Sequence, residues 1–188
     1  MIRALLVCAA TLVVAGCATP LTAPLPPAQS MLQRPVLASF NVSGRLAAQR
    51  GEEAVHGRFA WQHAEGQDRW QFFSPLGQTV AELDASGGMA VLQLADGARH
   101  VAPLSELLAR MLGADVPVAV LPRWVQAGVV DLDDVRERDP FGRPLRVVEQ
   151  GWEVRYRGYA ADGFDAPTRL VEVSRGDVSL KLLIDQWQ

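Results

Sequence analysis

The sequence is poor in the residues from which most enzymes build their reactive centres. Its 188 residues contain only two cysteines, Cys8 and Cys17, and three histidines. The histidines, His56, His63 and His100, are too scattered to indicate a metal site. The sequence also has no nucleophile elbow of the form G-x-S-x-G, no H-E-x-x-H zinc motif and no glycine-rich phosphate loop. We therefore expect no enzyme, no catalytic residue, no metal and no cofactor.

Strong charge is also missing. The formal net charge is −3, which argues against a general electrostatic binder of nucleic acid or of anionic membranes. The most charged stretch is residues 131–139. Its Asp131, Asp133 and Asp134 suggest a calcium-binding loop but lack the central glycine and the final glutamate of that motif. We interpret this stretch as a solvated loop.

Long hydrophobic runs are absent except at the N-terminus. Arg3 gives a short basic start, and the apolar run at residues 4–14 is too short to span a bilayer but suits a secretory signal peptide. Five prolines between residues 18 and 35 then predict an extended tether. A domain at residues 36–188 follows this tether.

The tetrad Val14-Ala15-Gly16-Cys17 resembles the lipobox of bacterial lipoprotein signals. The resemblance implies that residues 1–16 are removed and that Cys17 then carries an N-acyl chain and an S-diacylglycerol. The residue after Cys17 is alanine rather than aspartate, which in the enterobacterial sorting rule implies the periplasmic face of the outer membrane. The alternative is an ordinary cleaved signal peptide with an incidental cysteine.

From Val36 onward, apolar and polar residues alternate with period two, as in half-buried antiparallel strands joined by short turns. This pattern predicts a mainly β fold with two helices in the middle of the chain. An apolar stripe predicts a helix over residues 104–112, and a second short helix is expected near residues 121–125. Strands are predicted near residues 36–46, 55–62, 69–72, 80–83, 89–94, 99–102, 152–157, 170–173 and 178–188.

Such a long meander should curl. The two helices would then either fill the curled sheet completely or leave an apolar cavity. Small residues in the strands, such as Gly44 and Gly57, would let the sheet bend and would also leave room. The composition fits both arrangements.

An ordered set of short motifs resembles the outer-membrane lipoprotein receptor family LolB. Each motif is weak alone, but together they cover nearly the whole mature chain, with little signal in residues 129–143. The motifs are F-N-V-S-G-R-L at 40–46, F-A-W at 59–61, S-P-L-G-Q-T at 74–79, L-G-A-D-V-P-V at 112–118, L-P-R-W-V-Q-A-G at 121–128, G-W-E-V-R-Y at 151–156 and L-K-L-L-I-D-Q-W at 180–187.

The resemblance implies an α+β fold of the LolA/LolB type, an unclosed antiparallel β-barrel whose short helices cover an apolar cavity. It also implies a monomer that accepts lipoproteins from the periplasmic carrier LolA and inserts them into the outer membrane. Its partners would be LolA, the acyl chains of the cargo and outer-membrane lipid. The alternatives are a structural lipoprotein that only scaffolds an envelope complex, and a lipid-binding module for another acyl ligand.

The resemblance assigns the turn Ser74-Pro75-Leu76-Gly77 to a protruding membrane-insertion loop. Leu76 is a large apolar side chain on a turn, where polar residues are usual. The alternative is that Leu76 folds back onto the core. We further predict that seven residues line or border the acyl-chain cavity, although ordinary core packing would explain each of them equally well: Phe59, Trp61, Phe72, Trp124, Trp152, Tyr156 and Leu182.

The lipobox generates a direct prediction. Replacing Cys17 by alanine should abolish incorporation of radiolabelled palmitate and leave the protein with its signal peptide uncleaved, because lipid attachment precedes cleavage at this type of site. Labelling in cells followed by mass spectrometry of the intact protein measures both effects. Cys8→Ala is the matched control and should be lipidated like the wild type. Equal labelling of the Cys17→Ala protein would contradict the prediction.

Overall fold

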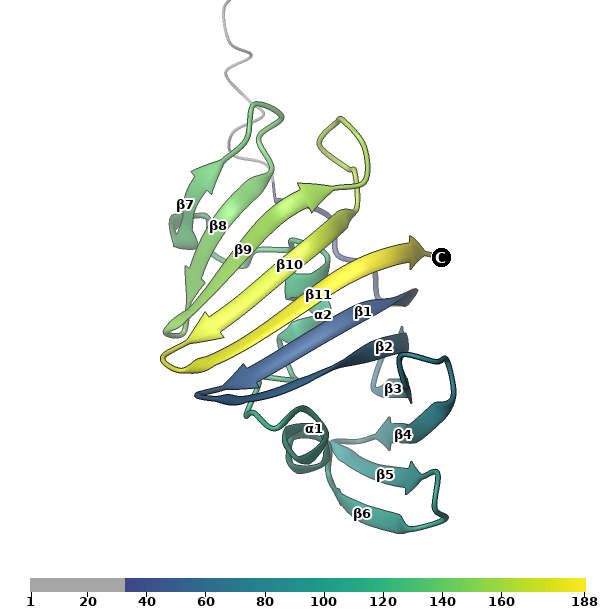
Figure 1. Ribbon diagram of the computed structural model, residues 1–188. Helices are drawn as coiled ribbons and strands as arrows, with labels where there is room; N and C mark the ends of the chain where they lie inside the picture. The colour runs from purple at the N-terminus through teal and green to yellow at the C-terminus, as the bar shows by residue number, and fades with distance from the viewer. Residues whose placement is uncertain (1–32) are drawn as a thin grey trace, which may run out of the picture.

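In the computed structural model, which describes residues 33–188, one antiparallel sheet carries two short α-helices on one side (Figure 1). Before the helices the chain forms β1 (Phe40–Arg50), β2 (Glu53–Ala64), β3 (Gln67–Phe73), β4 (Thr79–Ser86), β5 (Met89–Leu94) and β6 (Arg99–Pro103). The middle of the chain forms α1 (Leu104–Leu112), α2 (Leu121–Val125) and the 3-10 turn η2 (Leu132–Asp134). The last strands are β7 (Val135–Arg138), β8 (Pro144–Glu149), β9 (Trp152–Tyr159), β10 (Thr168–Arg175) and β11 (Val178–Trp187).

The strands form one sheet in the order β6-β5-β4-β3-β2-β1-β11-β10-β9-β8-β7. The first and last strands of the chain, β1 and β11, pair in its middle, and β6 and β7 form its two edges. The edges do not pair, so the curled sheet is an unclosed half-barrel. The predicted fold class, mainly β with an unclosed antiparallel barrel and two short helices, is confirmed.

The helices lie on the concave side because the chain has to travel from β6 at one edge to β7 at the other. In Figure 1 both helices are on the same side of the sheet, α2 behind β11 and β1 and α1 beside β4 and β5. The strands direct alternate residues to this side, as the buried Phe40, Val42 and Leu46 of β1 illustrate. Helices and concave face share one hydrophobic core.

The interpretation of residues 131–139 as a solvated loop is wrong. Asp131 accepts a hydrogen bond from the backbone nitrogen of Asp133 at 2.9 Å and caps η2, and β7 follows directly. β7 was missed because its sequence, Val-Arg-Glu-Arg, has only one apolar residue, as suits an edge strand with little buried surface. Its partner β8 was missed as well.

The predicted signal peptide, Cys17 and the tether up to residue 32 lie outside the described residues. The end of the predicted tether contacts the domain. Arg34 is buried, and its guanidinium donates to the backbone oxygens of Ala166 at 2.8 Å and Gln126 at 3.4 Å. Leu37 and the side-chain amide of Gln126 exchange two hydrogen bonds of 2.7 and 3.2 Å. The segment before β1 is therefore fixed to the end of α2.

Gly44 makes the closest approach in the central β1–β11 pairing. The register shifts between Ser43 and Gly44, and a Cβ atom at Gly44 would lie 2.0 Å from the backbone oxygen of Leu183. A side chain at this position would have to push β1 away from β11. This pairing joins the two halves of the sheet, so the close contact constrains the whole fold.

We expect Gly44→Ala to lower the free energy of unfolding by about 1–3 kcal/mol, because the added methyl group overpacks a backbone contact. Gly158→Ala in β9 is the matched control, since its Cβ would meet Arg169 at an ordinary 4.0 Å. The control should be neutral or gain up to about 1 kcal/mol. Urea unfolding followed by tryptophan fluorescence measures both, and equal stability of the two variants would contradict the close approach.

Candidate functional site

The turn between β3 and β4 holds Leu76 in water on a well-defined backbone. The backbone nitrogen of Gly77 donates to Ser74 O at 2.8 Å, and that of Ser74 donates to Gln78 O at 2.8 Å. Gly77 has a φ of +85°, which glycine adopts at low cost. Leu76 is 89% exposed, the largest exposure among the large apolar residues described, and so does not fold back onto the core.

The seven predicted cavity residues are all buried in one core. Their exposed fractions lie between 0% and 5%, and each belongs to the cluster that joins the concave face to the helices. Phe59, Trp61 and Phe72 come from β2 and β3, whereas Trp124, Trp152 and Tyr156 gather around α2. The concave face is therefore filled here, and the role of these residues in holding an acyl chain stays a prediction.

Trp70 was missed as a site residue, although it belongs to the same aromatic wall. Its ring stacks on Trp61 with centroids 4.1 Å apart, and Phe59 and Phe72 each lie 6.1 Å from it. The signal was available in the sequence, because Trp70 lies two residues before Phe72 and so points to the same face of β3. This wall covers the concave face of β2 and β3.

Apolar packing is the main attachment of α1. Leu107, Leu108 and Leu112 are buried against the core. Among residues 33–188, the only hydrogen bond that joins this helix to another element runs from Leu104 N to Gly88 O at 3.0 Å. Its single side-chain ion pair, Arg110 with Glu106, is internal and exposed. Another apolar surface could therefore replace these leucine contacts without breaking a network of buried polar bonds.

Polar bonds, in contrast, attach α2 to the sheet. Arg123 pairs with Glu149 of β8, and the Trp124 indole donates to the other carboxylate oxygen at 2.9 Å. The hydroxyl of Tyr156 donates to Trp124 O at 3.0 Å, and that of Thr168 donates to Val125 O. The Thr168 hydroxyl satisfies a carbonyl group at the end of the helix, where backbone acceptors commonly lack a partner, whereas Trp124 O also accepts from the backbone nitrogen of Ala127. Displacing α2 would break all of these bonds.

The acidity of Glu149 follows from this network. Burial by itself raises the pKa of its carboxyl group, but hydrogen bonds from Arg123 and Trp124, together with the Arg123 charge, outweigh burial and lower the pKa below the usual glutamate value. Burial also raises the pKa of Tyr156, which keeps its hydroxyl protonated as a donor. At neutral pH, Glu149 is therefore ionised and Tyr156 is protonated. These are the forms that make the hydrogen bonds to α2.

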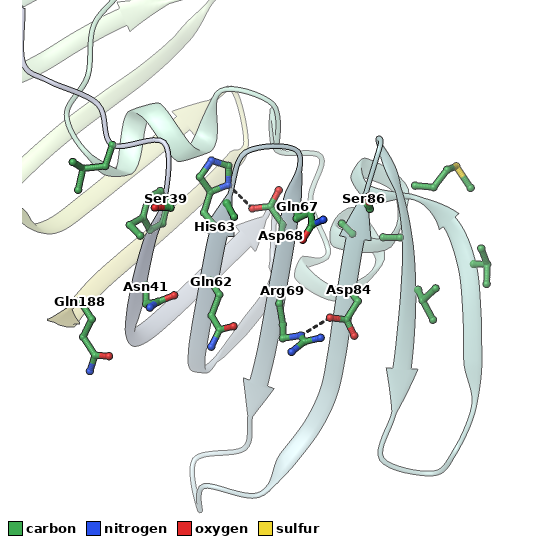
Figure 2. A pocket seen from close by; sticks show the side chains of 18 residues that line it. Ser39, Asn41, Gln62, His63, Gln67, Asp68, Arg69, Asp84, Ser86 and Gln188 are labelled. Carbon is green, nitrogen blue, oxygen red and sulfur yellow. Dashed lines mark hydrogen bonds and ion pairs between the residues drawn. The ribbon is translucent and has the colours of Figure 1, made fainter.

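A pocket of about 1010 Å³ lies at the opposite end of β3 from Leu76 (Figure 2). The exposed residues Asn41, Gln62, Arg69 and Asp84 line it, and they alternate with the buried residues of their strands. The pocket thus lies mainly on the outer face of the sheet and around the strand ends. None of the seven predicted cavity residues lines it. The acyl-chain prediction therefore finds no support in this pocket.

One of the three histidines, His63, is half-buried at this end of the sheet. Its Nδ1 lies 2.8 Å from Asp68 Oδ1, which also accepts the Trp61 indole N–H at 2.7 Å. Within residues 33–188, no group of three or more His, Cys, Asp or Glu is arranged to hold a metal ion. In the same part of the chain, no helix has the length and apolar character needed to cross a membrane.

An unclosed antiparallel half-barrel, with two helices over an apolar concave face, defines a protein of the LolA/LolB-like architecture. The chain belongs to the outer membrane lipoprotein LolB family, whose family model matches residues 38–187. This membership places it among the lipoproteins of the outer membrane.

Two curated relatives agree with the family. The outer-membrane lipoprotein LolB of Azoarcus sp. (strain BH72) is 42% identical over 98% of this chain and 94% of the relative. That of Thiobacillus denitrificans (strain ATCC 25259 / T1) is 35% identical over 92% of this chain and 90% of the relative. A crystal structure of a LolA superfamily protein from Nitrosomonas europaea aligns with a TM-score of 0.48 and 10% identity, over 85% of this chain and 90% of the other.

The α2 network generates a pH prediction. Because the pKa of Glu149 is lowered in the folded state, its stabilising effect is present above the pKa of an unfolded glutamate and is lost as the pH falls through the folded value. Glu149→Gln should lower the free energy of unfolding at pH 7 by about 1–3 kcal/mol. The difference from the wild type should shrink below about pH 4.

Urea unfolding at a series of pH values measures this difference. Glu106→Gln is the matched control, because Glu106 pairs only with the exposed Arg110 of its own helix. Its effect should stay below about 0.5 kcal/mol at every pH. If the difference in the free energy of unfolding between the wild type and Glu149→Gln stayed constant down to acidic pH, the stabilisation could not come from the ionised carboxylate of Glu149.

Proposed function

We propose that this chain takes lipoproteins from a LolA-type periplasmic carrier, holds their acyl chains between α1 and the sheet, and releases them into the outer membrane. The observation that carries the proposal is the weak polar attachment of α1 over an apolar face. An acyl chain that enters there exchanges one apolar contact for another. Membership of the LolB family supports lipoproteins as the cargo.

The hydrophobic effect prevents the acyl chains from crossing water during this transfer. A triacylated cargo has roughly 40 methylene groups, and exposing them all to water would cost about 30 kcal/mol at about 0.8 kcal/mol each. Cargo therefore has to pass from one apolar site to another without being wetted. We propose no nucleotide and no chemical step, so the direction of transfer follows from increasing affinity for the acyl chains.

In this proposal Leu76 is the contact with the bilayer. Burying one leucine side chain in lipid is worth about 1.5–3 kcal/mol, which is too little to anchor a protein but enough to favour one orientation at the surface. The turn hydrogen bonds at Ser74 and Gly77 present the side chain without further ordering. Lipid on Cys17 would supply the anchor itself.

A scaffold lipoprotein remains the second candidate, because one observation favours it. The concave face is filled by side chains in this structure, as a purely structural domain would require. The two functions differ in one measurable respect. Only a receptor has to lose the α1 contacts in order to bind acyl chains.

A transfer assay tests the proposal. A soluble carrier loaded with a lipoprotein is mixed with residues 18–188 of this protein, which lack the signal peptide and Cys17, with and without outer-membrane vesicles. Wild-type and Leu76→Glu loops should both accept cargo, whereas only the wild-type loop should deliver it efficiently to vesicles. We expect at least a tenfold loss of insertion for Leu76→Glu, about the effect of losing 1.4 kcal/mol of lipid contact.

Gln78→Glu is the matched control, because it adds the same charge at an exposed position of the same loop. It should insert cargo within about twofold of the wild type. Equal loss in the two variants would assign the effect to charge rather than to Leu76. Cargo that never leaves the carrier would reject the receptor function and favour the scaffold.

A further inference from the structure

Trp70 is a buried polar side chain in an otherwise apolar wall. It lies on the concave face of β3, is 4% exposed, and faces Leu83 across the β3–β4 pairing. Its ring stacks nearly parallel to those of Trp61 and Phe72, with interplanar angles of 14° and 6°. The aromatic surface therefore continues through Trp70 without a break.

The indole N–H of Trp70 has no acceptor. Three other tryptophans of the chain use theirs: Trp61 donates to Asp68 at 2.7 Å, Trp124 to Glu149 at 2.9 Å and Trp187 to Thr168 O at 2.8 Å. Within residues 33–188, Trp70 Nε1 is the one buried side-chain nitrogen or oxygen without a partner.

A donor buried without an acceptor costs free energy, and native proteins rarely keep one. Phenylalanine would avoid the cost, and it fills neighbouring positions of the same wall at Phe59 and Phe72. In this structure the Trp70 N–H has no such compensation, and an acceptor on a bound ligand would supply it.

Trp70 also lies on the part of the concave face that α1 crosses. The helix begins beside the β4–β5 turn, where Leu104 N bonds Gly88 O. It ends near β2, where a Cβ atom at Gly113 would lie 3.9 Å from Val55. Because β3 lies between β2 and β4 in the sheet, a ligand that displaces α1 reaches the wall that contains Trp70.

We infer that the Trp70 indole N–H donates a hydrogen bond to the ester or amide carbonyl oxygen at the root of a bound acyl chain. This inference rests on the proposed function. An acyl chain brings one carbonyl acceptor followed only by methylene groups, which matches one donor set in an apolar wall. A donor at this place fixes how deeply the chain enters, and it distinguishes acyl chains from alkyl chains.

A matched pair of lipids tests the inference. Monopalmitoylglycerol has an ester carbonyl, and 1-O-hexadecylglycerol has the same chain length and head group with an ether in its place. Their affinities for the purified protein are measured by displacement of a fluorescent fatty acid. We expect the wild type to bind the ester about three- to tenfold more tightly.

Two variants separate the hydrogen bond from the packing. Trp70→Phe should lower this ratio to about one, because it removes the donor and keeps an aromatic ring. Phe72→Leu, a neighbouring loss of volume without a donor, should weaken both lipids alike and keep the ratio. A ratio in Trp70→Phe that equals the wild-type ratio would overturn the inference.

A spectroscopic readout on the wild type does not depend on how well the variant folds. In ¹⁵N-labelled protein, the indole N–H resonance of Trp70 should shift downfield with the ester and not with the ether. Identical shifts with the two lipids would overturn the inference. If both lipids bind equally while carrier transfer succeeds, only the Trp70 role fails; if neither lipid binds and transfer fails, the proposed function fails with it.

Discussion

The architecture depends on the pairing of the first and last strands in the middle of the sheet. With β1 beside β11, the two strands that the long connection joins, β6 and β7, are forced to opposite edges. The connection between them then has to cross the sheet, and the concave side is where its apolar residues find partners. The helical cover and the shared core follow from this crossing. Where β1 and β11 pair, the absence of a side chain at Gly44 leaves room for the backbone carbonyl of Leu183.

Much of the fold was predictable, because most strands alternate strictly between apolar and polar residues. The helix over residues 104–112 was found from its leucine stripe, and α2 from its proline and tryptophan. β7 was missed because an edge strand buries little and so carries little pattern. β8 was missed because its sequence, Pro-Leu-Arg-Val-Val-Glu, does not alternate between apolar and polar residues. The pairing of β1 with β11 was not predicted, since alternation fixes which face a residue occupies but not which strand it meets.

The candidate site was predictable in part. A leucine between proline and glycine indicated an exposed apolar tip, and the structure leaves Leu76 in water. Periodicity identified the buried aromatic residues but not whether the helices pack against them, because packing depends on side-chain volumes brought together by the whole fold. The outer pocket beside Arg69 and the unpaired donor of Trp70 depend on neighbours distant in sequence, which no local pattern records.

The gap between β6 and β7 has a mechanical consequence. In a closed barrel, strand number and shear fix the radius, so the interior widens only if inter-strand hydrogen bonds break or change register. This sheet has no such closure. Small changes of twist at each strand pair can add up across eleven strands and spread the two edges, while every backbone ladder stays intact. The space inside the curved sheet can therefore widen or narrow to fit the molecule that occupies it.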